Sequence, residues 1–305
     1  MKPIRSHSIL PLLLTALLPF TAFAETKHGS ELEKGKNCGI PEGTTLTAST
    51  EKTFDKPGVI ENKIFTNVIT THNEGTVKFV RCKFINPGFV SMAEGDKASP
   101  GSERYTVQRK GKGSVELEDC EVYGGSSISI LNVDKLTRVY VAEGNDLLRV
   151  PKGDSFYTEV FAEKLLMASP ESHSDILQAT FNEAPADDPS VANIHLLRCK
   201  FDARGRIGED GKSTDPVNGA IQFGGFKANS GAKGEIIDCY FDGGSFSLQI
   251  GKPNPPSEPL KLRGNKFGRN YRYGPLRPGL KESHDADTSN VWADTGEPVP
   301  AKGAK

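Results

Sequence analysis

A short phrase that recurs along the chain constrains its fold more than any other feature. Each copy has an apolar lead-in, a charged residue, a Cys, one variable residue and then a Phe or Val. The copies occupy residues 79–84, 117–122, 196–201 and 236–241, and a fifth, at 262–267, has Asn265 in the Cys position. Such repetition is typical of solenoid proteins, in which each unit buries its apolar face only against neighbouring units.

The period within each copy is two residues, which predicts a strand with Cys and Phe on one face and charges on the other. Successive Cys residues of the repeat lie 38 (120 − 82), 79 (199 − 120) and 40 (239 − 199) positions apart. These separations are near multiples of about 20 residues, the size of one coil of a parallel β-helix. Weaker strands are predicted at 136–141 and 157–166.

The repeat therefore predicts an all-β fold, a single-stranded parallel β-helix with three sheets and long loop inserts. We expect one interior ladder from the Cys position and a second from the position two residues later. The first consists of Cys82, Cys120, Cys199, Cys239 and Asn265, and the second of Phe84, Val122, Phe201, Phe241 and Phe267. Inserts are expected at 93–113, 182–192 and 203–218. Inserts of a solenoid commonly emerge on one side and wall a groove.

The first 24 residues have the pattern of an export signal. Lys2 and Arg5 form a basic start, residues 9–20 form an apolar stretch, and Ala22 and Ala24 mark a cleavage site between small residues. We accordingly expect a secreted or periplasmic protein with a signal peptide at 1–24 and a flexible leader at 25–37. The β-helix should occupy 38–277, followed at 278–305 by a polar C-terminal tail that partly caps the last coil.

Charge and hydropathy exclude two classes of partner. Without Lys2 and Arg5 the chain has 36 basic (38 − 2) and 39 acidic side chains, a net charge near −3. Nucleic-acid-binding domains are usually basic, so no nucleic-acid partner is expected. After the signal no stretch approaches the roughly 20 apolar residues of a membrane span. We expect a monomer without a transmembrane segment.

The five cysteines leave two alternatives open. In an exported chain, Cys82–Cys120 and Cys199–Cys239 are possible disulfides, because neighbouring coils lie about 4.8 Å apart; Cys38 would then remain free. We favour stacked free thiols at these inward positions, because Cys packs as a small hydrophobic residue and a ladder of small residues needs no bond to stack. No CxxC motif or His/Cys cluster has zinc-site spacing. The sequence therefore predicts no metal site and identifies no cofactor.

A second series of strands ends in Gln after an aliphatic residue, at 175–178, 219–222 and 246–249. If the aliphatic residues point inward, Gln178, Gln222 and Gln249 form an outward ladder on one sheet. Side-chain amides donate and accept hydrogen bonds. The ladder would therefore bind either its own members or the hydroxyl groups of a sugar, and both alternatives stay open.

Two polar segments are candidate catalytic or binding sites. His173 and Asp175 form either an acid–base pair or a polar turn that leads into the first glutamine strand. The second segment, residues 267–275, contains Arg269, Tyr271, Arg272 and Tyr273. Arg and Tyr together suit contacts with carboxylates and sugars, but the same segment would also serve as a lid on the last coil.

Three motifs carry a resemblance to a known family. They are Ile-Pro-Glu-Gly-Thr-Thr-Leu-Thr at 40–47, His-Ser-Asp-x-x-Gln at 173–178 and Phe-Gly-Arg-x-Tyr-Arg-Tyr-Gly-Pro at 267–275. On these, residues 37–277 resemble the secreted right-handed parallel β-helix proteins of the pectate-lyase-like superfamily, and more narrowly a bacterial subgroup. The superfamily includes lyases, hydrolases, esterases and non-catalytic binders. The turn of its polygalacturonase-like hydrolases has a second carboxylate where this chain has Gln178, and the calcium-binding acids of pectate lyases have no clear counterpart.

The resemblance and the polar segments together predict an exported carbohydrate-active protein that binds an acidic polysaccharide and cleaves it by β-elimination. His173 is the expected base, oriented by Asp175, and Arg269 or Arg272 is expected to contact the uronate carboxylate. The expected substrate-binding residues are Gln178, Gln222, Gln249, Tyr271 and Tyr273. A non-catalytic glycan-binding or envelope-associated protein is the alternative, and a glycoside hydrolase is the third hypothesis.

Overall fold

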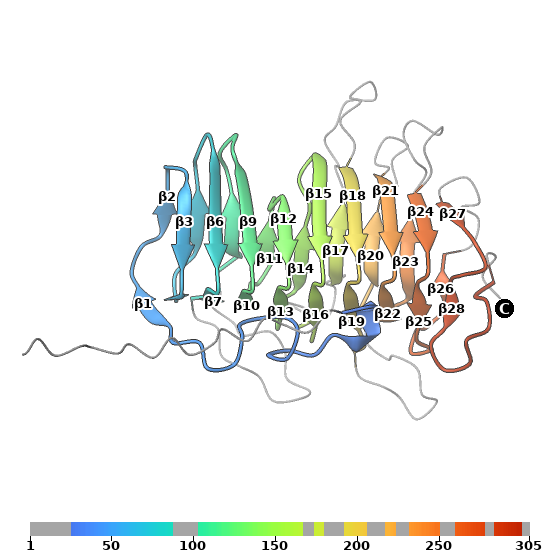
Figure 1. Cartoon of the computed structure of the whole chain (residues 1–305). Helices are drawn as coiled ribbons and strands as arrows, with labels where there is room; N and C mark the ends of the chain where they lie inside the picture. The colour runs from blue at the N-terminus through green and yellow to red at the C-terminus, as the bar shows by residue number, and fades with distance from the viewer. Residues whose placement is uncertain are drawn as a thin grey trace, which may run out of the picture.

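The computed structural model describes residues 26–87, 103–166, 174–179, 192–205, 217–223, 232–250, 260–277 and 284–300 (Figure 1). Over these ranges the chain contains strands, one short 3-10 helix, η1 (Gly29–Glu31), and no α-helix. The strands form three parallel sheets, in which each strand pairs with equivalent strands of neighbouring coils. The protein is therefore an all-β, single-stranded parallel β-helix, as the repeat predicted. Its arrangement is consistent with the right-handed form that parallel crossover connections favour.

In every complete coil of the described chain, sheet 3 leads to sheet 1 and sheet 1 leads to sheet 2. Sheet 1 contains β1 (Thr47–Ser49), β4 (Lys63–Phe65), β7 (Lys83–Ile85), β10 (Glu121–Tyr123), β13 (Tyr140–Ala142), β16 (Phe161–Glu163), β19 (Lys200–Ala203), β22 (Tyr240–Gly243), β25 (Lys266–Phe267) and β28 (Val291–Trp292). Sheet 2 contains β2 (Thr53–Phe54), β5 (Ile69–Thr71), β8 (Tyr105–Arg109), β11 (Ile128–Leu131), β14 (Asp146–Arg149), β17 (Asp175–Ala179), β20 (Gly219–Phe223), β23 (Phe246–Ile250) and β26 (Gly274–Leu276). Sheet 3 contains β3 (Gly58–Glu61), β6 (Thr76–Val80), β9 (Ser114–Glu118), β12 (Lys135–Thr137), β15 (Gly153–Thr158), β18 (Ala192–Leu197), β21 (Ala232–Ile237), β24 (Leu260–Arg263) and β27 (His284–Ala286).

The coils differ in length. Cys120, Val139, Val160 and Cys199 occupy one corner position in successive coils, which therefore contain 19 (139 − 120), 21 (160 − 139) and 39 (199 − 160) residues. The 38 residues from Cys82 to Cys120 form one enlarged coil, because β7 pairs directly with β10. A separation near 40 is therefore one coil of about 20 residues enlarged by an insert of similar length, and Cys82 and Cys120 lie on adjacent coils.

Each copy of the repeat turns a corner between two sheets rather than forming one strand. In the first copy β6 ends at Val80, β7 begins at Lys83, and Arg81 between them has a φ of 52°. The same left-handed conformation recurs at Asp119, Arg138, Glu159, Arg198 and Asp238. Such a residue interrupts the extended backbone and redirects the chain. The single strand predicted from the two-residue period was therefore wrong.

Both predicted interior ladders are nevertheless present. The Cys side chains are fully buried free thiols. The backbone N–H of Cys82 donates to Cys120 Sγ at 3.3 Å, and that of Cys199 donates to Cys239 Sγ at 3.3 Å. Asn265 continues this ladder by accepting from the Cys239 N–H at 2.9 Å. The second ladder is also fully buried and runs in register through Phe84, Val122, Val141, Ala162, Phe201, Phe241 and Phe267.

Residues 26–40 lie along the outside of sheet 1, where the sequence suggested a flexible leader. Leu32 and Cys38 are fully buried there. They form a small apolar cluster with side chains of the outer face: Tyr123, Tyr140, Ala142 and Phe161. The difference from the expectation has a simple cause, because Leu32 and Cys38 of this mostly polar segment remove the aromatic surface from water.

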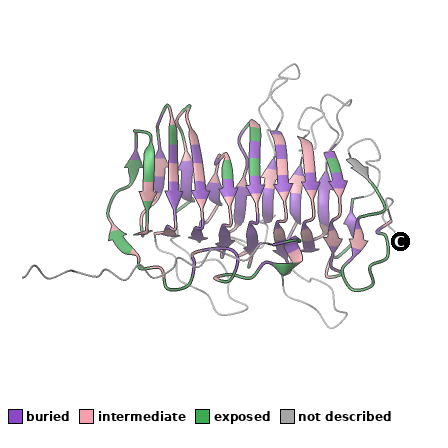
Figure 2. Ribbon diagram, in the orientation of Figure 1, coloured by how far each residue is buried: buried purple, intermediate pink, exposed green. Residues whose placement is uncertain are grey.

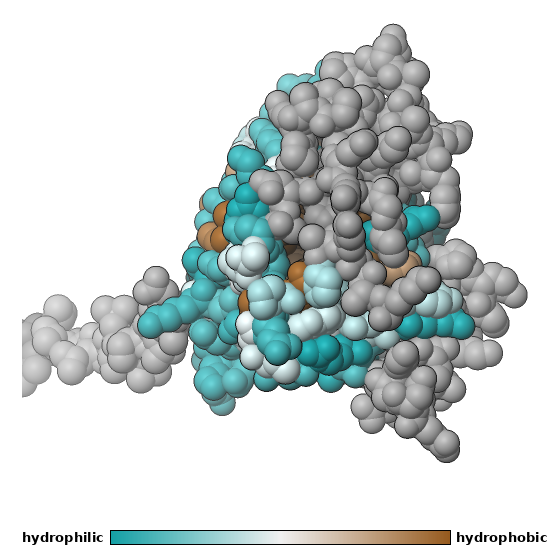
Figure 3. All heavy atoms as spheres, turned by 90° about the vertical axis from the view of Figure 1, so that its right-hand side faces the viewer, coloured by the Kyte–Doolittle hydropathy of each residue, from teal (hydrophilic) through white to brown (hydrophobic). Residues whose placement is uncertain are grey.

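The C-terminal residues add a final partial coil. β27 pairs with β24 and β28 pairs with β25, so parallel pairing continues past residue 277. Trp292 and Val299 join the main apolar core and cover the end of the last coil. Figure 2 shows the buried interior running along the solenoid, and Figure 3 shows a mostly hydrophilic described surface at the C-terminal end. No helix in the described part of the chain has the length and apolar character needed to cross a membrane.

Candidate functional site

The long connections of the solenoid join sheet 2 to the strands before and after it in the chain. At the corner between sheets 3 and 1 only two residues, Arg81 and Cys82, separate β6 from β7. By contrast, β7 ends at residue 85 and β8 begins at 105, while β17 ends at 179 and β18 begins at 192. The extra residues thus enter where the chain reaches or leaves sheet 2. The insert predicted at 93–113 was too long, because it includes β8; those at 182–192 and 203–218 lie mostly outside the described residues.

The three glutamines form the predicted ladder on this face. Gln178 pairs in register with Gln222, and Gln222 with Gln249. Arg149 occupies the same position one coil before Gln178. One guanidinium and three amides therefore lie in a row on four successive coils, about 4.8 Å apart. We call these four residues the polar row.

Hydrogen bonds join the polar row to Asp175 and Asn218. Arg149 Nη2 donates to Gln178 Oε1, and Gln178 Nε2 donates to Asp175 Oδ2 at 2.8 Å. Asn218 Nδ2 donates to the same Asp175 oxygen at 3.3 Å and to Gln222 Oε1 at 3.1 Å. Gln249 Nε2 donates to Asn218 Oδ1 at 2.6 Å, so these bonds hold the three amides in fixed orientations and connect the row across its four coils.

Two polar atoms of this network have no hydrogen-bond partner among the described residues. They are Arg149 Nε and Asp175 Oδ1, and both are buried. Buried polar atoms are nearly always paired, and an unpaired one costs about 1–3 kcal/mol. The network therefore retains two polar atoms that a ligand or ordered water would satisfy.

Two carboxyl groups of this face lie on neighbouring coils and are buried. Asp175 is 0% exposed and Asp146 is 6% exposed, and the backbone N–H of Asp175 donates to Asp146 Oδ1 at 3.0 Å. Burial raises the pKa of Asp175 to about 8 and the pKa of Asp146 to about 6, because a carboxylate loses hydration inside the protein. Near neutral pH Asp175 is therefore mostly protonated and Asp146 mostly ionised. Arg149 Nη2 lies 3.7 Å from Asp146 Oδ2.

Asp146 was missed from the sequence. Residues 146–149 have the same pattern as 175–178, namely Asp, two aliphatic residues and a polar residue, but the last residue is Arg149 instead of Gln. Residues 219–222 and 246–249 are related copies, with Gly219 or Phe246 in the first position and Ser247 in place of one aliphatic residue. A search for this pattern, rather than for its terminal Gln, finds the neighbouring coil and its carboxylate.

Arg269 and Tyr271 contact the C-terminal tail and not the polar row. Arg269 Nε lies 2.6 Å from Asp294 Oδ2, and its guanidinium lies 4.3 Å from the centre of the Trp292 ring. Tyr271 stacks on the same ring, with centroids 5.9 Å apart. These contacts correspond to the lid alternative for the 267–275 segment.

Arg272 and Tyr273 lie nearer to the polar row. The Tyr273 ring is 57% exposed and its centroid lies 5.6 Å from that of Phe246, the first residue of the strand that carries Gln249. The Arg272 guanidinium lies 5.2 Å from the centre of the Tyr273 ring. The structure thus places Tyr273 beside the strand at the end of the row, whereas His173 lies outside the described residues.

Comparisons of this chain with protein-family models, with curated proteins and with solved structures found no match. Within the described residues, no group of three or more His, Cys, Asp or Glu side chains is placed to hold a metal ion. The chemistry open to the site therefore follows from its own side chains. These are a guanidinium, a row of amides and two carboxyl groups in different protonation states.

Proposed function

We propose that this chain is an exported protein of the pectate-lyase-like superfamily that binds an acidic polysaccharide along the outer face of sheet 2 and cleaves it by β-elimination. The observation that carries the proposal is the register of Arg149, Gln178, Gln222 and Gln249 on four successive coils. The coil spacing of about 4.8 Å is close to the length of one sugar unit. A polysaccharide aligned with the solenoid axis would meet one polar side chain at each unit.

Binding would use groups that the network holds in place. The glutamine amides offer donors and acceptors for sugar hydroxyls. Arg149 supplies a cation for a uronate carboxylate, and its unpaired Nε–H is a donor that a ligand oxygen would satisfy. At the end of the row, the exposed Tyr273 ring offers a surface on which a sugar stacks.

The two carboxyl groups supply the acid and the base that β-elimination needs. One group must remove the proton beside the uronate carboxylate, and another must protonate the leaving oxygen. Asp146, mostly ionised at pH 7, suits the first role, and the protonated Asp175 suits the second. Arg149 would stabilise the charge that develops on the uronate carboxylate. His173, the base expected from the sequence, stays a second candidate for proton removal.

A glycoside hydrolase is the second candidate function, and the same pair favours it. Hydrolysis uses a protonated carboxyl group as acid and an ionised one as base or nucleophile, which is the division that the pKa values of Asp175 and Asp146 produce. The non-catalytic alternative is favoured by the burial of Asp175, whose side chain has no exposed surface.

Product analysis separates these functions. The mature chain would be incubated with a panel of acidic polysaccharides while ultraviolet absorbance of unsaturated uronates, reducing ends and calorimetric binding are measured. New absorbance supports elimination, and reducing ends without absorbance support hydrolysis. Binding without either supports the non-catalytic alternative. A wild-type chain that binds none of the acidic polymers contradicts the proposal.

Arg149→Ala tests the place of the site. We expect binding of the acidic polymer to weaken about tenfold or more, about 1.4 kcal/mol, and turnover to be lost. The matched control is Lys135→Ala, which removes an exposed cation from the outer face of sheet 3 and should change neither quantity. Equal losses of binding in the two variants would show that the overall charge of the protein attracts the polymer. They would contradict a binding site on the outer face of sheet 2.

A further inference from the structure

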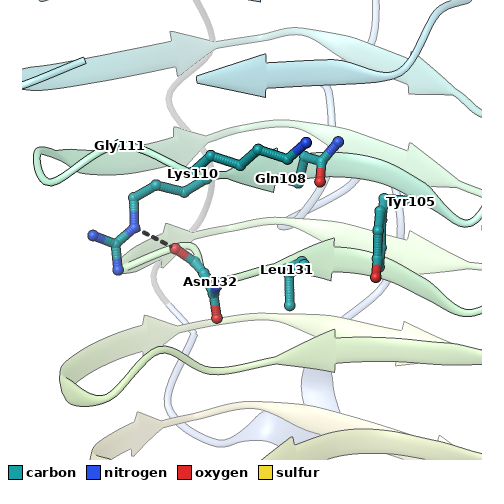
Figure 4. A pocket seen from close by; sticks show the side chains of 7 residues that line it. Tyr105, Gln108, Lys110, Gly111, Leu131 and Asn132 are labelled. Atoms are coloured by element: carbon teal, nitrogen blue, oxygen red, sulfur yellow. Dashed lines mark hydrogen bonds between the residues drawn. The ribbon is translucent and has the colours of Figure 1, made fainter. Parts of the chain in front are cut away.

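A cavity of about 580 Å³ opens on the outer face of sheet 2, at coils that precede the polar row (Figure 4). Its lining comes from β8, β11 and the turns that follow them, and includes Tyr105, Gln108, Lys110, Leu131 and Asn132. Pockets of about 300–1,000 Å³ commonly bind small molecules or single units of a polymer. Asp146 and Asp175 do not line this cavity, so it is distinct from the carboxyl pair.

The cavity is aligned with the polar row. Gln108 pairs in register with Leu131, Leu131 with Arg149, and Arg149 with Gln178. These residues therefore occupy the same strand position on successive coils, and they form one straight line, parallel to the solenoid axis, from the cavity to the glutamines. A linear ligand bound to the row reaches the cavity without changing direction.

The lining combines an apolar surface with amides. In Figure 4 the Leu131 side chain lies between Asn132 and Tyr105, and the Lys110 side chain extends toward Gln108. Tyr105 and Leu131 are half-buried, so each keeps part of its apolar surface open to a ligand. Sugars present an apolar ring face and a polar edge, and they suit a site that combines an aromatic ring with amide groups.

Of the two cations at the cavity, Arg109 is already engaged. Its Nε donates to Asn132 O at 2.7 Å, its Nη1 donates to Gly113 O at 2.9 Å, and its Nη2 lies 3.3 Å from Asp134 Oδ1. Lys110 is exposed, and its ammonium group forms no ion pair with any of the described residues. The cavity therefore offers one positive charge that no acidic side chain among the described residues neutralises.

We propose that this cavity is a subsite for one acidic sugar, in which Lys110 binds the carboxylate and the Tyr105 and Leu131 side chains pack against the ring. The inference rests on the proposed function, because the same polysaccharide would continue into the polar row. From Gln108 to Gln249 the row crosses five coil intervals, about 24 Å. A bound chain of about six sugar units contacts both the subsite and the whole polar row.

The length dependence of binding tests this subsite. Oligouronates, from the single uronic acid to chains of about eight units, would be titrated into the mature chain by calorimetry. We expect the affinity of the wild type to increase with oligouronate length up to about six sugar units. The affinity of Lys110→Ala should stop increasing at about four units, because the polar row alone contacts about four. The control is Lys112→Ala, because Lys112 is an exposed lysine of the same turn that does not line the cavity.

The outcomes distinguish the subsite from the proposed function. A plateau at the same length in Lys110→Ala and wild type overturns the subsite, as does an equal effect of Lys112→Ala. If Arg149→Ala weakens binding while Lys110→Ala does not, the proposed function stands and the subsite fails. If the wild type binds no oligomer, saturation-transfer NMR with single glucuronate and galacturonate decides: a signal that Lys110→Ala removes supports the subsite, and no signal overturns it.

Discussion

The protonation of Asp175 depends on residues far from it in the chain. Its backbone contacts Asp146, 29 residues earlier, and its carboxylate accepts from Asn218, 43 residues later. The sequence places Asp175 before a glutamine strand and predicts the glutamine ladder, because register follows from the recurring aliphatic–Gln pattern. Burial of the carboxyl group was not predictable, because it is set by coils that inserts of unknown length separate from β17.

We expect Asp175 to make stability fall as the pH rises from about 4 to about 8. Its pKa is 3.8 without the folded environment and about 8 within it. In this window the unfolded chain releases a proton that the folded chain retains, so the free energy of unfolding decreases with pH and levels off above about 8. Asp175→Asn is neutral in both states and should remove this contribution, worth up to about 5 kcal/mol at pH 8. Urea unfolding at several pH values measures it; identical slopes in both proteins would contradict a buried, protonated Asp175.

Phe201 is expected to contribute strongly to the stability of the interior ladder. It is fully buried and packs edge-on against Phe241, with centroids 5.9 Å apart. Phe201→Ala should lower the free energy of unfolding by about 3–5 kcal/mol, because the rigid coils above and below cannot close the cavity. Phe156, 47% exposed on the outer face of sheet 3, is the matched control, and Phe156→Ala should cost about 1 kcal/mol or less. Similar losses in the two variants would be inconsistent with the assigned ladder.

At the scale of elements, the repeated corner explains both what the repeat predicted and what it did not. Cys and Phe were assigned to the interior correctly, because both are buried whichever way the chain passes between them. The corner itself was missed, because its left-handed residue is a charged one such as Arg81 or Asp119, whereas Gly is the usual sequence signal for that conformation. The alternation of inward and outward residues also continues through a corner of two residues. The sequence pattern alone therefore does not reveal that the chain changes direction there.

Asn265 should be the least replaceable member of the corner ladder. Its Oδ1 accepts from the Cys239 N–H, and its Nδ2 donates to Ile236 O at 2.9 Å and to Asn290 Oδ1 at 2.8 Å. Asn265→Ala leaves buried partners unsatisfied, and we expect a loss of about 2–4 kcal/mol in unfolding free energy. Asn265→Cys restores the residue found at Cys239 and should recover part of that loss, because a thiol is a weak acceptor. Denaturant unfolding of the three proteins checks this, and equal stability of the Ala and Cys variants would refute the role of the hydrogen bonds.

At the scale of the whole molecule, the N-terminal segment 26–40 connects coils that are otherwise joined only to their neighbours. The Gly29 N–H donates to Asp238 O at 2.8 Å, and the Gly39 N–H donates to Arg138 O at 2.9 Å. The segment therefore crosses the outer face of sheet 1 from β22 back to β13. Its docking was not predictable, because the apolar residues of this charged segment, Leu32, Cys38 and Ile40, are too sparse to show the period of a strand or a helix. The stability of a solenoid is nearly a sum of contributions from adjacent units. Because segment 26–40 contacts several coils at once, it joins the central coils into one region that unfolds cooperatively.

Leu32→Ala should loosen these central coils and leave the first coils unchanged. Leu32 is fully buried between the segment and sheet 1, and truncation of a buried Leu typically costs about 2–5 kcal/mol. The measurable loss cannot exceed the free energy that docks the segment, because the segment can detach while the β-helix stays folded. Hydrogen exchange should therefore accelerate in 26–40 and in β13, β16 and β19, which the segment covers, and stay unchanged in β4 and β7. Uniform acceleration of exchange along the solenoid would show that the β-helix unfolds as a single unit, and would contradict a stabilising role of segment 26–40 that is confined to the central coils.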